Sequence, residues 1–169
     1  MRTLIAIDNS PFSQTVVDAV SRRRWPERTE FRIITVIEPL AVSDDSSAIS
    51  EYSHTVSQIR KYRERAARQK CEEARRQLQA ILPGALIDVD IREGSPRALI
   101  INAASEWAAD EIIIGAHSRE LCPRDLIGSV SRAVAAHAPC SVEIVRPAQH
   151  DMQSLTKHSQ KKTTKKRIS

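Results

Sequence analysis

The stretch TLIAIDNSP at residues 3–11 joins a strand to a helix and sets the pattern for most of the chain. Its continuous apolar run is typical of a parallel strand that is buried on both faces. Ser10 and Pro11 are residue types that favour the first positions of a helix, and the apolar side chains after them recur at helical spacing. The stretch therefore predicts a strand at 3–8, followed by a helix from Pro11 to about Arg24.

The same alternation of strand-like and helix-like runs continues to residue 146. The predicted strands are 3–8, 31–38, 85–92, 111–115 and 141–146, and the predicted helices are 11–24, 51–82, 96–107 and 128–137. The third and fifth strands are interrupted by acidic residues and suit the edges of a sheet, whereas the others suit its centre. With right-handed crossovers, the strand order is 3-2-1-4-5. The sequence thus predicts an α/β fold with a single doubly wound, Rossmann-like sheet of five parallel strands.

The longest predicted helix, 51–82, carries an apolar stripe that is expected to pack on the sheet. The stripe consists of Val56, Ile59, Ala66, Ala74 and Leu78. The many Arg and Glu residues at the other positions are expected to be solvated.

The net charge of +5 has its origin in the C-terminal segment. Residues 150–169 contain six Lys or Arg residues and one Asp, so the remaining residues of the 169 sum to zero. The segment has too few apolar residues to offset the entropy of ordering it. We therefore expect one domain at 1–148 and a disordered basic tail at 149–169. Such a tail can be an inert extension, or it can contact nucleic acid or acidic partners.

Several classes of protein are disfavoured by composition. No apolar run approaches the roughly 18 residues of a membrane span. Cys71, Cys122 and Cys140 form no C-x-x-C pair, which predicts neither a disulfide framework nor a zinc site and favours a reducing cytoplasm. No nucleophile, base and acid stand at a recognisable spacing, so no catalytic residue and no enzyme activity are predicted.

In a doubly wound sheet, a ligand binds where the strand order reverses, beyond the carboxyl ends of the first and fourth strands. Asp8 follows the first of these strands, and Gly115 ends the other. Gly128, Ser129 and Ser131 lie at the start of the last helix. Free N–H groups and the helix dipole favour an anion there, and the two serines offer hydroxyl donors. The pattern indicates a phosphate site, although a Gly-Ser pair also begins ordinary helices and an Asp also stabilises turns.

Four segments resemble the universal stress protein family. They are LIAIDNS at 4–10, EGSP at 93–96, IIIG at 112–115 and SVSRAVAAHAPCSVEIVR at 129–146. The resemblance covers about residues 2–146. Nucleotide-binding members of this family carry the motif G-x2-G-x9-G-[ST]. Gly115, Ser118, Gly128 and Ser129 reproduce its spacing, with a serine in place of the second glycine.

The resemblance implies a cytoplasmic, stress-linked protein that binds ATP with Mg²⁺ and acts through conformation or partners. Asp8 would contact the nucleoside, Val36 would lie beside adenine, and the glycine motif would hold the ribose and phosphates, with Arg119 and Arg124 as charge partners. The implied cofactor-binding residues are Ala6, Asp8, Val36, Ile114, Gly115, Ser118, Arg119, Gly128, Ser129, Val130 and Ser131.

The resemblance also implies a homodimer through the last strand, 141–146. Slow incidental ATP hydrolysis stays open within this interpretation. Because Ser118 replaces a glycine, one alternative is a nucleotide-free dimeric interaction module of the same fold. Another is a nucleic-acid-associated protein that acts through its basic tail.

Overall fold

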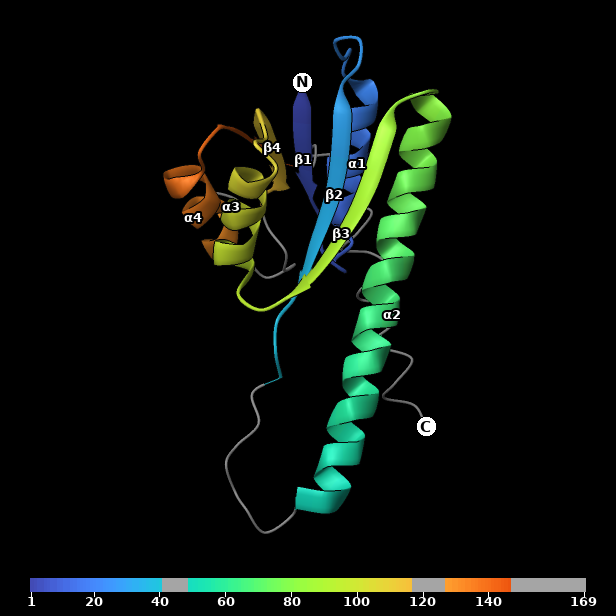
Figure 1. The fold of residues 1–169 in the computed structure, drawn as a ribbon, viewed down its shortest axis with the longest axis vertical. Coiled ribbons are helices and arrows are strands. Elements are labelled where there is room, and N and C mark those ends of the chain that lie inside the picture. The colour runs from blue at the N-terminus through green and yellow to red at the C-terminus, as the bar shows by residue number, and fades with distance from the viewer. Residues whose placement is uncertain (41–48, 117–126, 147–169) are drawn as a thin grey trace, which may run out of the picture.

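A computed structural model of the chain describes residues 1–40, 49–116 and 127–146 (Figure 1). Its elements are β1 (Arg2–Ala6), α1 (Ser13–Arg22), β2 (Glu30–Ile37), α2 (Ile49–Ile81), β3 (Leu86–Glu93), α3 (Pro96–Glu106), β4 (Glu111–Gly115), α4 (Ser129–His137) and β5 (Ser141–Val145). All four strand pairings are parallel, and the sheet order is β3-β2-β1-β4-β5. The predicted doubly wound fold is confirmed. The predicted tail at 149–169 lies outside the described residues.

The core consists of two apolar layers, one on each face of the sheet. Ile5 of β1 belongs to the layer that α1 and α2 cover, together with Val20 and Leu78. Leu4 and Ala6 belong to the layer that α3 and α4 cover. Successive side chains of a strand point to opposite faces, so a central strand with helices on both faces must be apolar throughout. This requirement explains the continuous apolar runs of the central strands.

Both predicted edge strands lie at the edges of the sheet. The charge that interrupts the apolar run of β5 belongs to Glu143, whose carboxylate lies 3.0 Å from the guanidinium of Arg23. The same guanidinium lies 2.8 Å from Glu111, which is nearly buried at the start of β4. The hydrogen bond to Glu111 raises the pKa of Arg23 above its ordinary value. Arg23 thus links the end of α1 to the two strands beside it.

The predicted boundaries of the first strand and helix need correction. β1 ends at Ala6 instead of Asp8, and α1 begins at Ser13 instead of Pro11. Asp8 accepts a hydrogen bond from the N–H of Ser10 at 3.0 Å and one from the hydroxyl of Ser13 at 2.8 Å. These bonds hold the intervening residues in a turn, so the helix starts later than the Ser-Pro signal indicates.

The helix α2 extends past the carboxyl ends of β2 and β3 (Figure 1). A helix of 33 residues spans about 50 Å, whereas a strand of eight residues spans about 26 Å. Within residues 55–81 of α2, the buried side chains are Ala67, Cys71, Ala74 and Leu78, all in the C-terminal half of the helix. The prediction that Ile59 is buried is wrong, because this side chain is 42% exposed. The next residue, Arg60, pairs with Glu93 at the last position of β3, so Ile59 lies near the end of the sheet.

Gly94 and Gly84 both adopt a positive φ, and they allow a matched test of backbone strain. Gly94 has φ +146°, and an added Cβ would lie 2.9 Å from Cδ1 of Leu99. Gly84 has φ +85° and open space around the same position. We expect Gly94→Ala to lower the free energy of unfolding by about 2–3 kcal/mol and Gly84→Ala by about 1 kcal/mol, as measured by urea denaturation. Equal losses would show that Leu99 accommodates the added methyl group freely.

Candidate functional site

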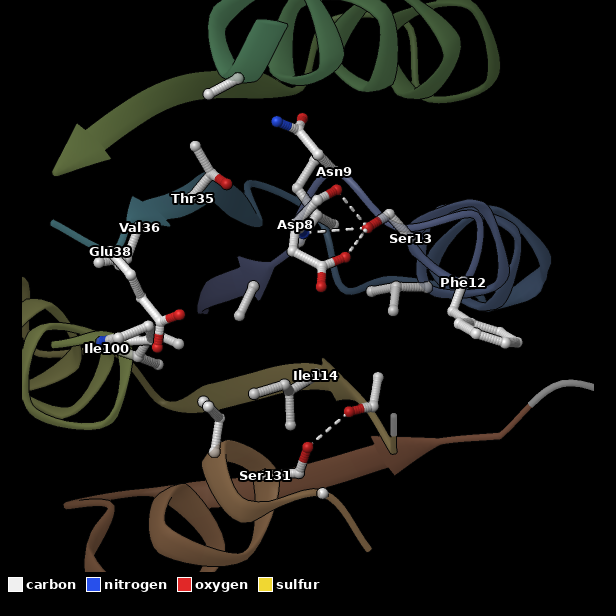
Figure 2. A pocket seen from close by; sticks show the side chains of 18 of the residues that line it. Asp8, Asn9, Phe12, Ser13, Thr35, Val36, Glu38, Ile100, Ile114 and Ser131 are labelled. Atoms are coloured by element: carbon white, nitrogen blue, oxygen red, sulfur yellow. Dashed lines mark hydrogen bonds between the residues drawn. The ribbon is translucent and has the colours of Figure 1, made fainter. Parts of the chain in front are cut away.

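A cavity of about 270 Å³ opens at the carboxyl ends of β1, β2 and β4, where the strand order reverses (Figure 2). Nine of the eleven predicted binding residues line it: Ala6, Asp8, Val36, Ile114, Gly115, Gly128, Ser129, Val130 and Ser131. The other two, Ser118 and Arg119, lie outside the described residues, as does Arg124. The fold thus assembles the described part of the predicted site from four separate segments of the chain.

Asp8 is a turn residue and a cavity residue at once. Its N–H donates to the Ser13 hydroxyl at 2.9 Å, and that hydroxyl lies 2.8 Å from Oδ1 of Asp8 (Figure 2). The N–H of Ser10 donates to the same Oδ1. No hydrogen bond within the described segments uses Oδ2, and the half-buried carboxylate lines the cavity. One oxygen of Asp8 therefore stabilises the turn, and the other is available to a ligand.

Gly128 precedes α4 with φ −57° and ψ 156°, a conformation that any residue adopts. Its own N–H donates to the carbonyl oxygen of Ala116 at 2.8 Å. The next three N–H groups, of Ser129, Val130 and Ser131, belong to the first turn of the helix and have no acceptor within it. All three residues line the cavity. This end of the cavity thus combines free donors with the positive end of the helix dipole, which suits an anion.

The hydroxyl group of Ser131 has a different role from the one that the sequence indicates. It is buried and donates to the carbonyl oxygen of Gly115 at 2.6 Å (Figure 2). A serine hydroxyl has one proton, so in this arrangement it offers a ligand only its lone pairs. The side chain of Ser131 instead fixes the start of α4 to the end of β4. Its backbone N–H remains available to the cavity.

Val36 presents main-chain hydrogen-bonding groups to the opposite part of the cavity. The carbonyl oxygen of Ile37 accepts a hydrogen bond from the N–H of Gly94 on the β3 side. The carbonyl oxygen of Ile34 accepts one from the N–H of Ile7 on the β1 side at 3.0 Å. Because backbone groups alternate in direction along a strand, Val36 faces the β1 side. The chain of β1 has already turned away at that level, and no described residue pairs with the N–H or C=O of Val36. A donor and an acceptor therefore lie side by side in the cavity wall.

Several lining residues were missed by reasoning from the sequence. They are Phe12, Ser13, Thr35, Glu38, Arg63, Pro96 and Ile100, among others. Glu38 was detectable, since it lies two residues after Val36 and shares its face of the strand. Arg63 comes from α2, and its guanidinium donates to the carbonyl oxygen of Glu38 at 2.7 Å. No local pattern marks Arg63, because its place in the wall depends on how α2 packs.

The cysteines and acidic residues form no second site in the described ranges. Burial raises the pKa of the Cys71 thiol to about 12, and it also raises the pKa of Cys140. Both thiols are therefore protonated at neutral pH and serve in packing. Cys122 lies outside the described residues. Across 1–40, 49–116 and 127–146, no three His, Cys, Asp or Glu side chains come together as metal ligands, and no helix could cross a membrane.

Comparison with known proteins shows which family this chain resembles. The model of the universal stress protein family matches residues 1–146. A universal stress protein of Synechocystis is 26% identical over 86% of this chain and 97% of its own length. The solved structure of the hypothetical protein MJ0577 superposes with a TM-score of 0.71 at 20% identity, covering 88% of this chain and 96% of that chain. A universal stress protein in complex with cAMP superposes with a TM-score of 0.60 at 24% identity, covering 88% and 98%.

The family match extends from the first strand to the last described residue, and it includes every wall of the cavity. The strand order and the cavity at the switch point were established independently of it. This chain therefore belongs to the universal stress protein family.

Proposed function

We propose that this protein binds ATP in the cavity between β1, β2 and β4. It would act in the cytoplasm as a stress-response regulator, through conformation and partner binding and without turnover. The observation that carries the proposal is the pairing of two kinds of open hydrogen-bonding group in one cavity. N–H groups without a partner inside the helix begin α4, and the N–H and C=O of Val36, which have no partner in the described part of the chain, lie in the wall formed by β2. The complex of a family member with cAMP supports an adenine nucleotide as the ligand.

The phosphates are assigned to the start of α4 because this end of the cavity is built for anions. The N–H groups of Ser129, Val130 and Ser131 are free of partners within the helix. Hydrogen bonds from N–H groups to a charged phosphate are shorter and stronger than those to neutral acceptors. Mg²⁺ would enter already bound to the phosphates, which lowers the charge that the protein has to accommodate.

The nucleoside is assigned to the region of Asp8 and Val36. Oδ2 of Asp8 is suited to accept hydrogen bonds from ribose hydroxyl groups, because an ionised carboxylate is an acceptor only. The N–H and C=O of Val36 match an adenine edge, which offers a ring nitrogen acceptor beside an amino donor. Apolar side chains of Ile100 and Ile114 line the same cavity and suit the faces of a base.

The direct test is calorimetric titration of ATP with Mg²⁺ into the full-length protein. We expect saturable binding with one nucleotide per chain, together with a rise in the thermal unfolding midpoint, because a ligand that binds only the folded state stabilises it. Absence of both heat and thermal shift at millimolar ATP would contradict the proposal.

Asp8→Asn separates the two roles of Asp8. Asparagine keeps an acceptor oxygen for Ser10 and Ser13 but replaces the second oxygen with an amide donor. We expect ATP binding to weaken by roughly tenfold or more, because a charge-assisted hydrogen bond to the ribose is lost. The unfolding midpoint in urea is expected to stay close to that of the wild type. Unchanged ATP affinity would show that Asp8 serves the turn alone.

We also propose that the protein is a homodimer that pairs through β5. Among the described residues, this strand is hydrogen-bonded only to β4, so its other edge presents backbone groups with no partner in that part of the chain. Val142 and Ile144 are half-buried in the isolated chain and would be covered further in a dimer. Light scattering at micromolar concentration should give twice the 18.9 kDa mass of one chain. The mass of a single chain would contradict this assembly.

A further inference from the structure

Glu38 is a residue of the cavity wall that carries a carboxylate group. It follows the last residue of β2 and lies two positions beyond Val36, so both side chains are on the same face of the strand. Both line the cavity, and Figure 2 shows the Glu38 side chain reaching from the end of β2 toward Ile100 of α3. Its carboxylate takes part in none of the ion pairs or side-chain hydrogen bonds found in the described segments.

The backbone around Glu38 is held from both sides. The guanidinium of Arg63 donates to the carbonyl oxygen of Glu38 at 2.7 Å, and the N–H of Gly94 donates to Ile37 at 3.0 Å. The end of β2 is thereby attached to α2 and to the residue after β3. The carboxylate is thus presented beside Val36 from a fixed main chain. The side chain is exposed to solvent, and a glutamate carboxylate accepts hydrogen bonds but cannot donate them.

We propose that Glu38 determines the base specificity of this site by accepting a hydrogen bond from the exocyclic amino group of adenine. This inference rests on the proposed nucleotide function. The amino group of adenine has two protons, so it can donate one to the carbonyl oxygen of Val36 and the other to the Glu38 carboxylate. Hypoxanthine carries a carbonyl oxygen at the same position. Glu38 would face that oxygen with a second acceptor, and the two would repel each other.

The experiment compares ATP with ITP, the triphosphate whose base is hypoxanthine. ITP has a carbonyl oxygen in place of the exocyclic amino group and carries a proton on the adjacent ring nitrogen. Both are titrated into the wild type, Glu38→Gln and Glu93→Gln. Glutamine has nearly the same size as glutamate but can turn its amide donor toward a carbonyl oxygen. We expect the ratio of the ITP and ATP dissociation constants to fall by roughly tenfold in Glu38→Gln. The loss of a negative charge strengthens binding of both triphosphates equally, so it cancels in the ratio.

Glu93→Gln is the matched control. Glu93 ends the neighbouring strand β3, its carboxylate pairs with Arg60, and it does not line the cavity. We expect the ratio of the ITP and ATP dissociation constants in Glu93→Gln to equal that of the wild type. An identical ratio in all three proteins, or an equal change in both variants, would overturn the role of Glu38 while leaving ATP binding in place. Failure of the wild type to bind either nucleotide would overturn the proposed function and this inference together.

Discussion

Gly128→Ala is expected to weaken ATP binding on the order of 100-fold without unfolding the protein. The methyl group would stand at the start of α4, where a phosphate must approach the N–H groups of Ser129 and Val130. Hydrogen bonds to a charged group contribute about 1.5–3 kcal/mol each, so the loss of one strong bond or the weakening of two, about 2.7 kcal/mol in total, accounts for an effect of this size. Calorimetric titration of ATP with Mg²⁺ measures it.

The fold tolerates this substitution because the backbone at Gly128, with φ −57° and ψ 156°, is open to alanine. We expect a loss of about 1 kcal/mol of stability from the poorer helix cap. Gly84→Ala is the matched control, because it makes the same change at a glycine that does not line the cavity. It is expected to lower stability by a similar amount and to leave ATP binding unchanged. Wild-type affinity in Gly128→Ala would contradict the phosphate assignment.

Leu78→Ala is expected to lower the free energy of unfolding by about 3–4 kcal/mol, as measured by urea denaturation. Leu78 is 0% exposed and belongs to the apolar layer that α2 forms with the sheet. Truncation removes the transfer free energy of its side chain and leaves a cavity beneath a helix that cannot collapse freely onto the strands. Because domains are stable by only about 5–15 kcal/mol, this loss is a large fraction of the total.

Ile81→Ala on the same helix is the control for Leu78→Ala. Ile81 is 51% exposed, so about half of its surface is hydrated in the folded protein and truncation loses much less burial than at Leu78. We expect a change of less than about 1 kcal/mol, since alanine also favours the helix. Equal losses in the two variants would contradict the packing of α2 that the structure shows.

The residues that line the cavity were predictable to the extent that they follow strand ends or begin a helix. Asp8, Gly115 and Gly128 were located in this way, and all three line the cavity. The role of Ser131 was not predictable, because its hydroxyl donates to Gly115, sixteen residues earlier. The burial of Ile59 was predicted wrongly, since helical periodicity does not indicate where the sheet below a helix ends.

The sequence by itself determined the α/β class, the strand order and the location of the switch point. Each of these depends on local information, such as apolar runs, turn residues and helix starts, which act within a few residues of one another. The tertiary structure alone decided that the turn from Asp8 to Ser13 delays α1, and that α2 extends past the sheet. It also decided that Arg63 of α2 holds the end of β2 at Glu38. The turn is a local side-chain arrangement that apolar periodicity does not encode, whereas the other two features depend on how segments far apart in the chain pack.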